Sequence, residues 1–197
     1  WIYYGGEDTP IREFYHYPNV ICIPGKYTDN QLMLDRFVAF DDKMVEIMFV
    51  RDADSRINER DEWCIREFIN SPKLFHIIRD HPYHAYYHTP ILGGLWGIKR
   101  GCLPHFNIAR AEEIYIQDRP NCRGFDQNFL GEIIYPKVGK DALIHGIAIE
   151  GHNETAVPIP FTSEHIFCGQ VIEYDESGRE YHNCDDCRII MTNEDSD

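Results

Sequence analysis

Apolar residues recur along this chain in two patterns, and each pattern predicts a different kind of element. Short, mostly apolar runs predict strands over residues 19–23, 44–50, 75–78, 91–98 and 142–145. Apolar residues three and four positions apart predict amphipathic helices over residues 31–40, 58–70 and 126–134. We expect the second of these helices to stop before Ser71 and Pro72, and the third to end at Pro136, because proline interrupts a helix.

The run over residues 44–50 is the strongest predicted strand. Its near-continuous apolar character predicts burial on both faces, as in the central strand of an α/β sheet. Because strands alternate with helices, we expect an α/β fold with a central mixed sheet flanked by helices. A single domain is expected over residues 1–177, followed by a polar, charged tail over residues 178–197. Trp1 already lies in a strand-like run, so a further N-terminal piece is expected before it.

The formal net charge of the chain is −14. Nucleic acids and anionic membrane surfaces select for Lys and Arg, so this charge argues against both as partners. An anionic substrate would need a divalent metal or a few focused arginines. No apolar run reaches the roughly 18 residues needed to cross a bilayer, so no membrane span is expected. The seven cysteines are odd in number and scattered, which favours reduced thiols in the cytoplasm.

Two aspartates, Asp52 and Asp54, follow the strongest predicted strand. The carboxyl edge of an open α/β sheet is where such folds bind ligands. In an extended backbone the two side chains would point the same way, and Mg²⁺ and Mn²⁺ prefer such oxygen ligands, often bridging a carboxylate to a diphosphate. The pair therefore predicts a metal site. The alternative is an N-cap and a surface turn before the next helix.

Four segments carry a resemblance to a known family, in the order 50–56, 75–82, 91–97 and 125–130. Together they resemble small GT-A-fold glycosyltransferases of bacteria and large DNA viruses, including the chlorella-virus enzymes that glycosylate capsid protein. The resemblance implies a Rossmann-related GT-A sheet whose first strand and helix precede Trp1. It also implies a Mn²⁺- or Mg²⁺-dependent transfer from a nucleotide-sugar, a UDP-sugar by preference, to a glycan or glycoprotein. A viral member would act in the host cytoplasm.

The resemblance places metal and catalytic roles on particular residues. Asp54 is the expected first metal ligand and Asp52 the second, with a share in binding the ribose. His145 is expected to complete the metal site, with His152 in reserve, although a histidine at a strand end can equally bond to backbone. Asp126, followed by Gln127, is expected to face the donor sugar and acceptor, as a general base or an orienting group. The alternative for Asp126 is a helix N-cap.

The donor-binding residues implied by the resemblance come from several segments. They are Arg36, Arg51, Asp52, Ala53, Asp80, Gly93, Gly94 and Trp96. Arg36 suits phosphate oxygens through bidentate geometry, while its alternative is an ordinary ion pair with a neighbouring carboxylate. The two glycines let backbone approach a ligand, and Trp96 is expected to stack on a sugar. The alternative for Trp96 is a core residue beside a bulge.

Two other functions stay open on the sequence. A metal-dependent phosphodiesterase or hydrolase would use the same aspartates with histidines to activate water. A non-catalytic carbohydrate-binding module is supported by the aromatic content of 13%. The first would release phosphate without sugar transfer, and the second would bind glycans without any nucleotide.

Overall fold

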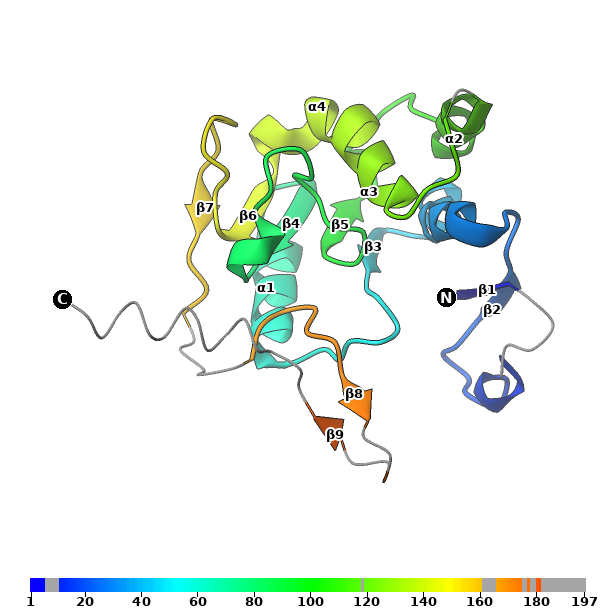
Figure 1. Cartoon of the computed structure of the whole chain (residues 1–197). Coiled ribbons are helices and arrows are strands. Elements are labelled where there is room, and N and C mark those ends of the chain that lie inside the picture. The colour runs from blue at the N-terminus through cyan, green and yellow to red at the C-terminus, as the bar shows by residue number, and fades with distance from the viewer. Residues whose placement is uncertain (6–10, 118, 161–165, 175–176, 178–179, 182–197) are drawn as a thin grey trace.

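Five strands form the central sheet of the computed structural model, in the order β3-β5-β4-β6-β7 (Figure 1). They are β3 (Ile47–Val50), β4 (Phe75–Arg79), β5 (Trp96–Lys99), β6 (Leu143–Gly146) and β7 (Ala156–Val157). β5 runs antiparallel to β3 and β4, whereas β4, β6 and β7 are mutually parallel. The predicted mixed α/β architecture is thereby confirmed. The structure describes residues 1–5, 11–117, 119–160, 166–174, 177 and 180–181.

β4 lies in the middle of the sheet, and all five of its residues are buried. Alternate residues of a strand point to opposite faces, so β4 contributes to two separate layers. Phe75 stacks on Trp96 on one face, with ring centroids 5.6 Å apart. His76 stacks on Phe68 on the other face, at 4.8 Å. A strand buried on both sides needs helices on both sides, and the fold supplies them.

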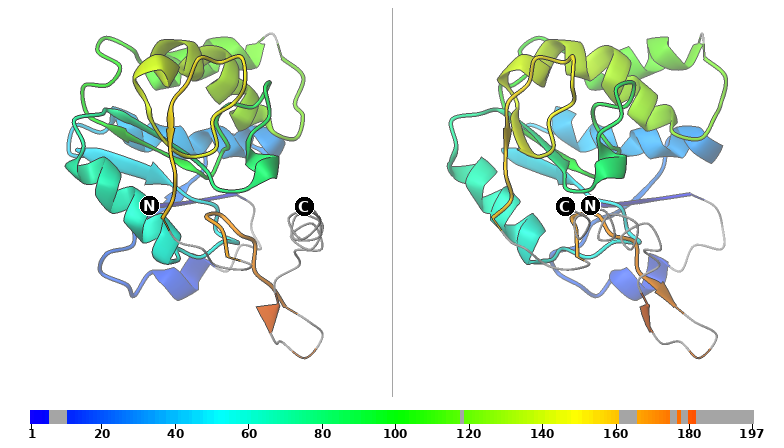
Figure 2. Two further views of the ribbon diagram at one scale, coloured as in Figure 1. Left: turned by 90° about the vertical axis from the view of Figure 1, so that its left-hand side faces the viewer. Right: turned by 60° about the vertical axis from the view of Figure 1, so that its left-hand side comes forward.

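Figure 2 shows α1 (Glu59–Asn70) on one face of the sheet, with α3 (Phe125–Phe129) and α4 (Tyr135–Val138) on the other. The side chain of Asn58 caps α1 by accepting hydrogen bonds from the backbone amides of Arg60 and Asp61. Phe37, from the 3₁₀ helix η2 (Asp29–Asp41), packs on Trp96 on the α3 side. The other helices are η1 (Ile11–Phe14), η3 (Pro82–His84), α2 (Ile108–Gln117), η4 (Leu130–Ile134) and η5 (Gly139–Asp141).

Two small strand pairs lie outside the central sheet. β1 (Ile2–Tyr4) pairs parallel with β2 (Cys22–Pro24), and β8 (Glu173–Tyr174) pairs antiparallel with β9 (Glu180–Tyr181). The predicted boundary at residue 178 falls between β8 and β9. Apart from β9, the predicted tail lies outside the described residues. No helix in the described ranges is both long and apolar enough to cross a membrane.

Three predicted elements differ in the structure. β3 is an edge strand rather than the central one, and only Met48 and Val50 are buried in it. The predicted strand over 91–98 shortens to β5, because the amide of Leu95 closes a turn on the carbonyl of Leu92. Helical structure passes through Pro136, which sits in the first turn of α4 after the π-helical turn η4. Because proline lacks an N–H, it removes one hydrogen bond from this continuous run of helix, and the π-helical turn lies directly before it.

A buried ion pair joins β4 to the segment after β6. Arg79 is fully buried, and its Nη1 and Nη2 atoms lie 2.6 Å and 2.9 Å from the two carboxylate oxygens of Glu154. Arg79 also donates to the carbonyl of Pro90, at 2.6 Å from Nη2, and Glu154 accepts from the hydroxyl of Tyr135. The ion pair therefore links β4 to the loop between β4 and β5, to α4 and to the segment before β7.

The substitution Glu154→Gln is expected to lower the free energy of unfolding by about 3 kcal/mol, because it leaves the Arg79 charge buried without an anion. Urea unfolding measures the loss. The matched control is Glu150→Gln, an exposed neighbour, whose effect should stay within about 0.5 kcal/mol. Equal stability of the two variants would show that the buried pair contributes nothing.

Candidate functional site

Arg36 lies between two aspartates that are far apart in the sequence. Its Nη1 atom is 3.0 Å from Oδ1 of Asp52 and 3.3 Å from Oδ2 of Asp126. η2 supplies the arginine, the end of β3 supplies Asp52, and the first turn of α3 supplies Asp126. The structure thus brings together three of the predicted site residues. Both carboxylates share one guanidinium, which leaves the cluster with a net negative charge.

Gly93 and Gly94 press their backbone against this cluster. A Cβ atom on Gly93 would lie 2.2 Å from Oδ2 of Asp126, and one on Gly94 would lie 2.2 Å from Oδ2 of Asp52. Any side chain here would displace the carboxylates. Glycine is therefore needed at both positions because the backbone packs directly against the two carboxylates. The sequence predicted a different reason, namely the approach of the backbone to a ligand.

Asp126 is 2% exposed, and its Oδ1 atom has no hydrogen-bond partner among the described residues. Burial raises the pKa of this carboxyl group, while the nearby Arg36 charge opposes the rise. Asp126 is the second residue of α3, whose N-cap position belongs to Gly124, so the N-cap alternative is wrong. A buried carboxylate with a raised pKa and a free oxygen suits proton transfer. Gln127 beside it is half-buried.

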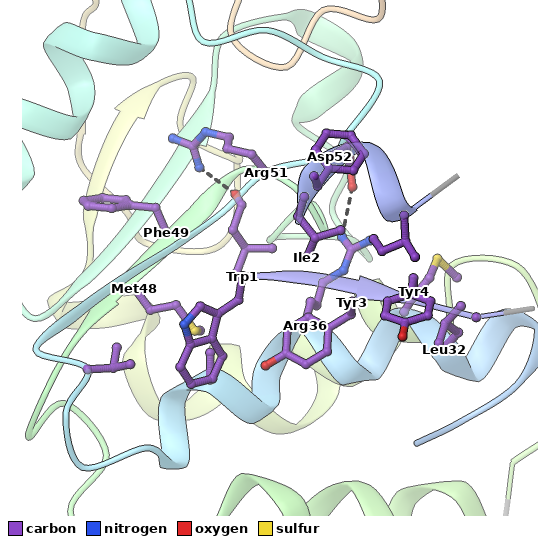
Figure 3. Close-up of a pocket in the computed structure, with 18 of the residues that line it drawn as sticks. Trp1, Ile2, Tyr3, Tyr4, Leu32, Arg36, Met48, Phe49, Arg51 and Asp52 are labelled. Atoms are coloured by element: carbon purple, nitrogen blue, oxygen red, sulfur yellow. Dashed lines mark hydrogen bonds and ion pairs between the residues drawn. The ribbon is translucent and has the colours of Figure 1, made fainter. Parts of the chain in front are cut away.

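A pocket of about 1030 Å³ opens between the N-terminal segment, η2 and β3 (Figure 3). Its polar lining includes Arg36, Asp52 and the backbone around Ala53. Figure 3 shows the Arg36–Asp52 ion pair beside the side chains of β1. The aromatic lining residues are Trp1, Tyr3, Tyr4, Phe14 and Phe49. The pocket therefore combines an apolar, aromatic wall with one charged region.

The pattern over residues 1–4 predicts a strand but not the aromatic wall. The concentration of aromatic residues before residue 18 is the feature of the sequence that could have indicated it. Apolar side chains from β1 and β3 become neighbours only when η2 packs between them. That packing depends on contacts across the fold rather than on local periodicity.

The segment from Asp52 to Ser55 is a turn rather than an extended strand. The hydroxyl of Ser55 donates to the Asp52 carbonyl at 3.0 Å, so the alternation expected for extended backbone does not apply. Asp54 is exposed, and its carbonyl accepts a hydrogen bond of 2.9 Å from the amide of Ile172. Ser55 also forms a β-bridge with Val171. The segment before β8 therefore fixes the backbone of the acidic motif.

The predicted third metal ligand, His145, lies elsewhere. It is 1% exposed on β6, its Nδ1 atom lies 2.7 Å from Nε2 of His76, and its ring packs on Trp63 of α1. Burial lowers the pKa of His76 well below its ordinary value. This histidine pair thus belongs to the layer between the sheet and α1. The reserve candidate, His152, contacts the carbonyl of Tyr87 at 2.9 Å.

Three other predicted donor-binding residues have structural partners. Trp96 is 1% exposed and donates to the carbonyl of Gly93 at 3.1 Å. Stacking of Trp96 on a sugar is therefore wrong, because its ring is part of the core. Asp80 pairs with Arg60, with its Oδ2 atom 2.6 Å from Nε. Arg51 pairs with the buried Asp61 at 3.1 Å, although it also lines the pocket.

Among the described residues, no group of three or more His, Cys, Asp or Glu is arranged to hold a metal. Asp52 and Asp54 supply hard oxygen ligands, and the Asp52 side chain is half exposed. Mg²⁺ is usually held by one or two carboxylates together with substrate phosphates. Such a site needs both carboxylates to face one ion, and the turn over residues 52–55 does not supply the common direction expected of an extended strand.

Comparison with known proteins adds no assignment, since the chain matches no family model, no curated protein and no solved structure. The geometry of the site is therefore the basis for any functional conclusion.

A buried carboxyl group lies beneath η2, the element that carries Arg36. Glu112 of α2 is fully buried without an ion-pair partner among the described residues, and it lies near the hydroxyl of Tyr27. Burial raises the pKa of Glu112 to about 8, with the Lys26 charge opposing the rise. The folded protein therefore holds a proton that the unfolded chain releases near its ordinary value of 4.5.

Because the folded state binds the extra proton, this group's contribution to stability is present below about pH 4.5 and is lost as the pH rises to about 8. Glu112→Gln should abolish that loss and make the protein about 3 kcal/mol more stable than the wild type at pH 8. Thermal or urea unfolding at several pH values measures it. Glu67→Gln, at an exposed position of α1, should leave the pH profile unchanged. A pH profile of Glu112→Gln that matches the wild type would contradict the expectation.

Proposed function

We propose that this chain is a metal-dependent glycosyltransferase of the GT-A type. It would move a sugar from a nucleotide-sugar, a UDP-sugar by preference, to a glycan or glycoprotein acceptor, with Mn²⁺ or Mg²⁺. The observation that carries the proposal is the cluster of Arg36, Asp52 and Asp126 beside a pocket with aromatic walls. The resemblance of four sequence segments to that family gives the finer fold and the choice of UDP.

The charges in the cluster suit a diphosphate only when a cation is present. Asp52 and Asp54 repel phosphate oxygens, and Arg36 is already shared between two carboxylates. A divalent metal on Asp52 and Asp54 would neutralise the diphosphate as it leaves the sugar. Arg36 can then turn one of its remaining N–H groups to the phosphate. The aromatic wall of the pocket suits a flat nucleobase.

Asp126 has the properties of a general base. Its Oδ1 atom is buried without a hydrogen-bond partner among the described residues and would accept the proton of an acceptor hydroxyl once the substrate reaches it; burial raises the pKa of this carboxyl group. Gly93 leaves no space between the loop and this carboxylate, which holds the side chain in one position.

The five described cysteines are free thiols, which supports a cytoplasmic setting.

The metal requirement is tested by calorimetric titration with UDP. The wild type is expected to bind UDP at least about tenfold more tightly with Mn²⁺ than without it. Asp54→Asn should lose this metal dependence and keep its folded stability, because the side chain is exposed. Asp141→Asn, at another exposed aspartate, should bind as the wild type does. Equal UDP affinity with and without Mn²⁺ would refute the metal assignment.

The role of Asp126 is tested by separating transfer from nucleotide binding. Asp126→Asn should lower the transfer rate by about 10²- to 10⁴-fold and change the UDP dissociation constant by less than about threefold. Wild-type transfer should also fall toward low pH as Asp126 protonates. Radiolabelled sugar transfer and calorimetry give the two readouts. Undiminished transfer by Asp126→Asn would remove the general-base role.

A further inference from the structure

After Asp80, which is paired with Arg60, the loop between β4 and β5 contains no acidic or basic residue other than histidine. Charged residues make up 26% of the chain, yet residues 81–98 contain no Asp, Glu, Lys or Arg. The same loop exposes three tyrosines: Tyr83 is 49% exposed, Tyr86 51% and Tyr87 56%. In a chain with a net charge of −14, this surface is locally neutral and aromatic.

Two of these tyrosines form one face. The rings of Tyr83 and Tyr86 are stacked, with centroids 6.5 Å apart and planes 25° apart. Tyr87, the next residue in the sequence, packs on the ring of His152, with ring centroids 4.5 Å apart. Each tyrosine offers an apolar ring face together with a hydroxyl that can donate or accept a hydrogen bond. We call Tyr83 and Tyr86 the tyrosine surface.

The loop that carries the tyrosine surface is held at several points. Arg79 bonds to the carbonyl of Pro90, and His152 contacts the carbonyl of Tyr87. The ring of His81 accepts a hydrogen bond from the amide of Tyr83 at 3.2 Å. Tyr86 and Thr89 form a β-bridge. The backbone that carries the exposed rings is therefore held in place before any ligand arrives, which reduces the entropic cost of binding.

The same loop continues into the proposed catalytic cluster. A Cβ atom on Gly131, in the helical segment after α3, would lie 3.5 Å from the carbonyl of His88 and 3.3 Å from Pro90. A few residues later, Gly93 packs against Asp126. One rigid loop thus connects the tyrosine surface to the proposed general base.

We propose that the tyrosine surface binds the acceptor as a neutral oligosaccharide. Sugar rings expose faces of C–H groups, which pack on aromatic rings, and hydroxyl groups at their edges, which pair with tyrosine hydroxyls. An anionic polysaccharide or nucleic acid would need cations, and residues 81–98 provide none. The role of this saccharide as the acceptor rests on the proposed glycosyltransferase function. Saccharide binding by the tyrosine surface can be measured independently of that function.

The test uses the full chain without nucleotide or metal. Saturation-transfer NMR and calorimetry are run with hexasaccharides of glucose, mannose and N-acetylglucosamine, and with an oligouronate as the anionic probe. At least one neutral hexasaccharide should bind, and the oligouronate should not. Tyr86→Ala should weaken this binding by about tenfold, and Tyr86→Phe, which keeps the ring, by less than about threefold.

The control is Tyr17→Ala, a residue 50% exposed on another part of the chain, which should leave saccharide binding unchanged. Melting curves confirm that each variant is folded. Failure of every neutral hexasaccharide to bind, or equal binding by Tyr86→Ala and the wild type, would overturn the inference. Light scattering tests the alternative that a second copy of the chain binds the tyrosine surface. A dimer that Tyr86→Ala converts to a monomer, without any saccharide binding, would support that alternative and overturn the inference.

Titration of the same variants with UDP and Mn²⁺ separates the two proposals. Unchanged UDP affinity in Tyr86→Ala, together with lost saccharide binding, supports both. Saccharide binding without any UDP binding would support the tyrosine surface as a saccharide site and refute the glycosyltransferase function. UDP binding without saccharide binding would support the nucleotide site and refute saccharide binding by the tyrosine surface.

Discussion

Each carboxylate that leaves water in this acidic chain needs compensation, and arginine supplies it at the places that hold the fold together. The desolvation of an unpaired carboxylate costs several kcal/mol, so these pairs restrict which segments can meet. The one-to-one pairs are Arg51–Asp61, Arg60–Asp80 and Arg79–Glu154. They join β3 to α1, α1 to the end of β4, and β4 to the segment before β7. Glu112 has no such partner, and its raised pKa follows from that.

The Arg36 cluster departs from this pattern, because one arginine faces two carboxylates and the exposed Asp54 lies nearby in the chain. In the three one-to-one pairs each buried carboxylate has its own arginine, whereas here two carboxylates share one. The cluster beside the pocket therefore keeps an excess of negative charge. A divalent cation would offset this negative charge and so allow a diphosphate to approach, which is the physical core of the proposed function.

The proposed donor and acceptor regions are chemically different, and the loop between β4 and β5 connects them. Its glycines press on Asp52 and Asp126, while its tyrosines face solvent. The charged end would hold an anionic donor, and the neutral end would hold an uncharged sugar. Asp126 lies where the loop meets α3, between the proposed donor and acceptor regions, as a general base for the acceptor hydroxyl would have to.

Local signals in the sequence were enough for α1, β4, β6 and the position of the acidic motif. Asn58 caps α1, and short apolar runs mark strands that are buried whatever their neighbours. Only the tertiary structure decided that β3 lies at an edge, that Trp96 belongs to the core and that His145 pairs with His76. Likewise, nothing local joins Arg36 to Asp126. Periodicity records whether a residue is buried, but its partner is chosen by strand order and helix packing, which depend on residues far away in the chain.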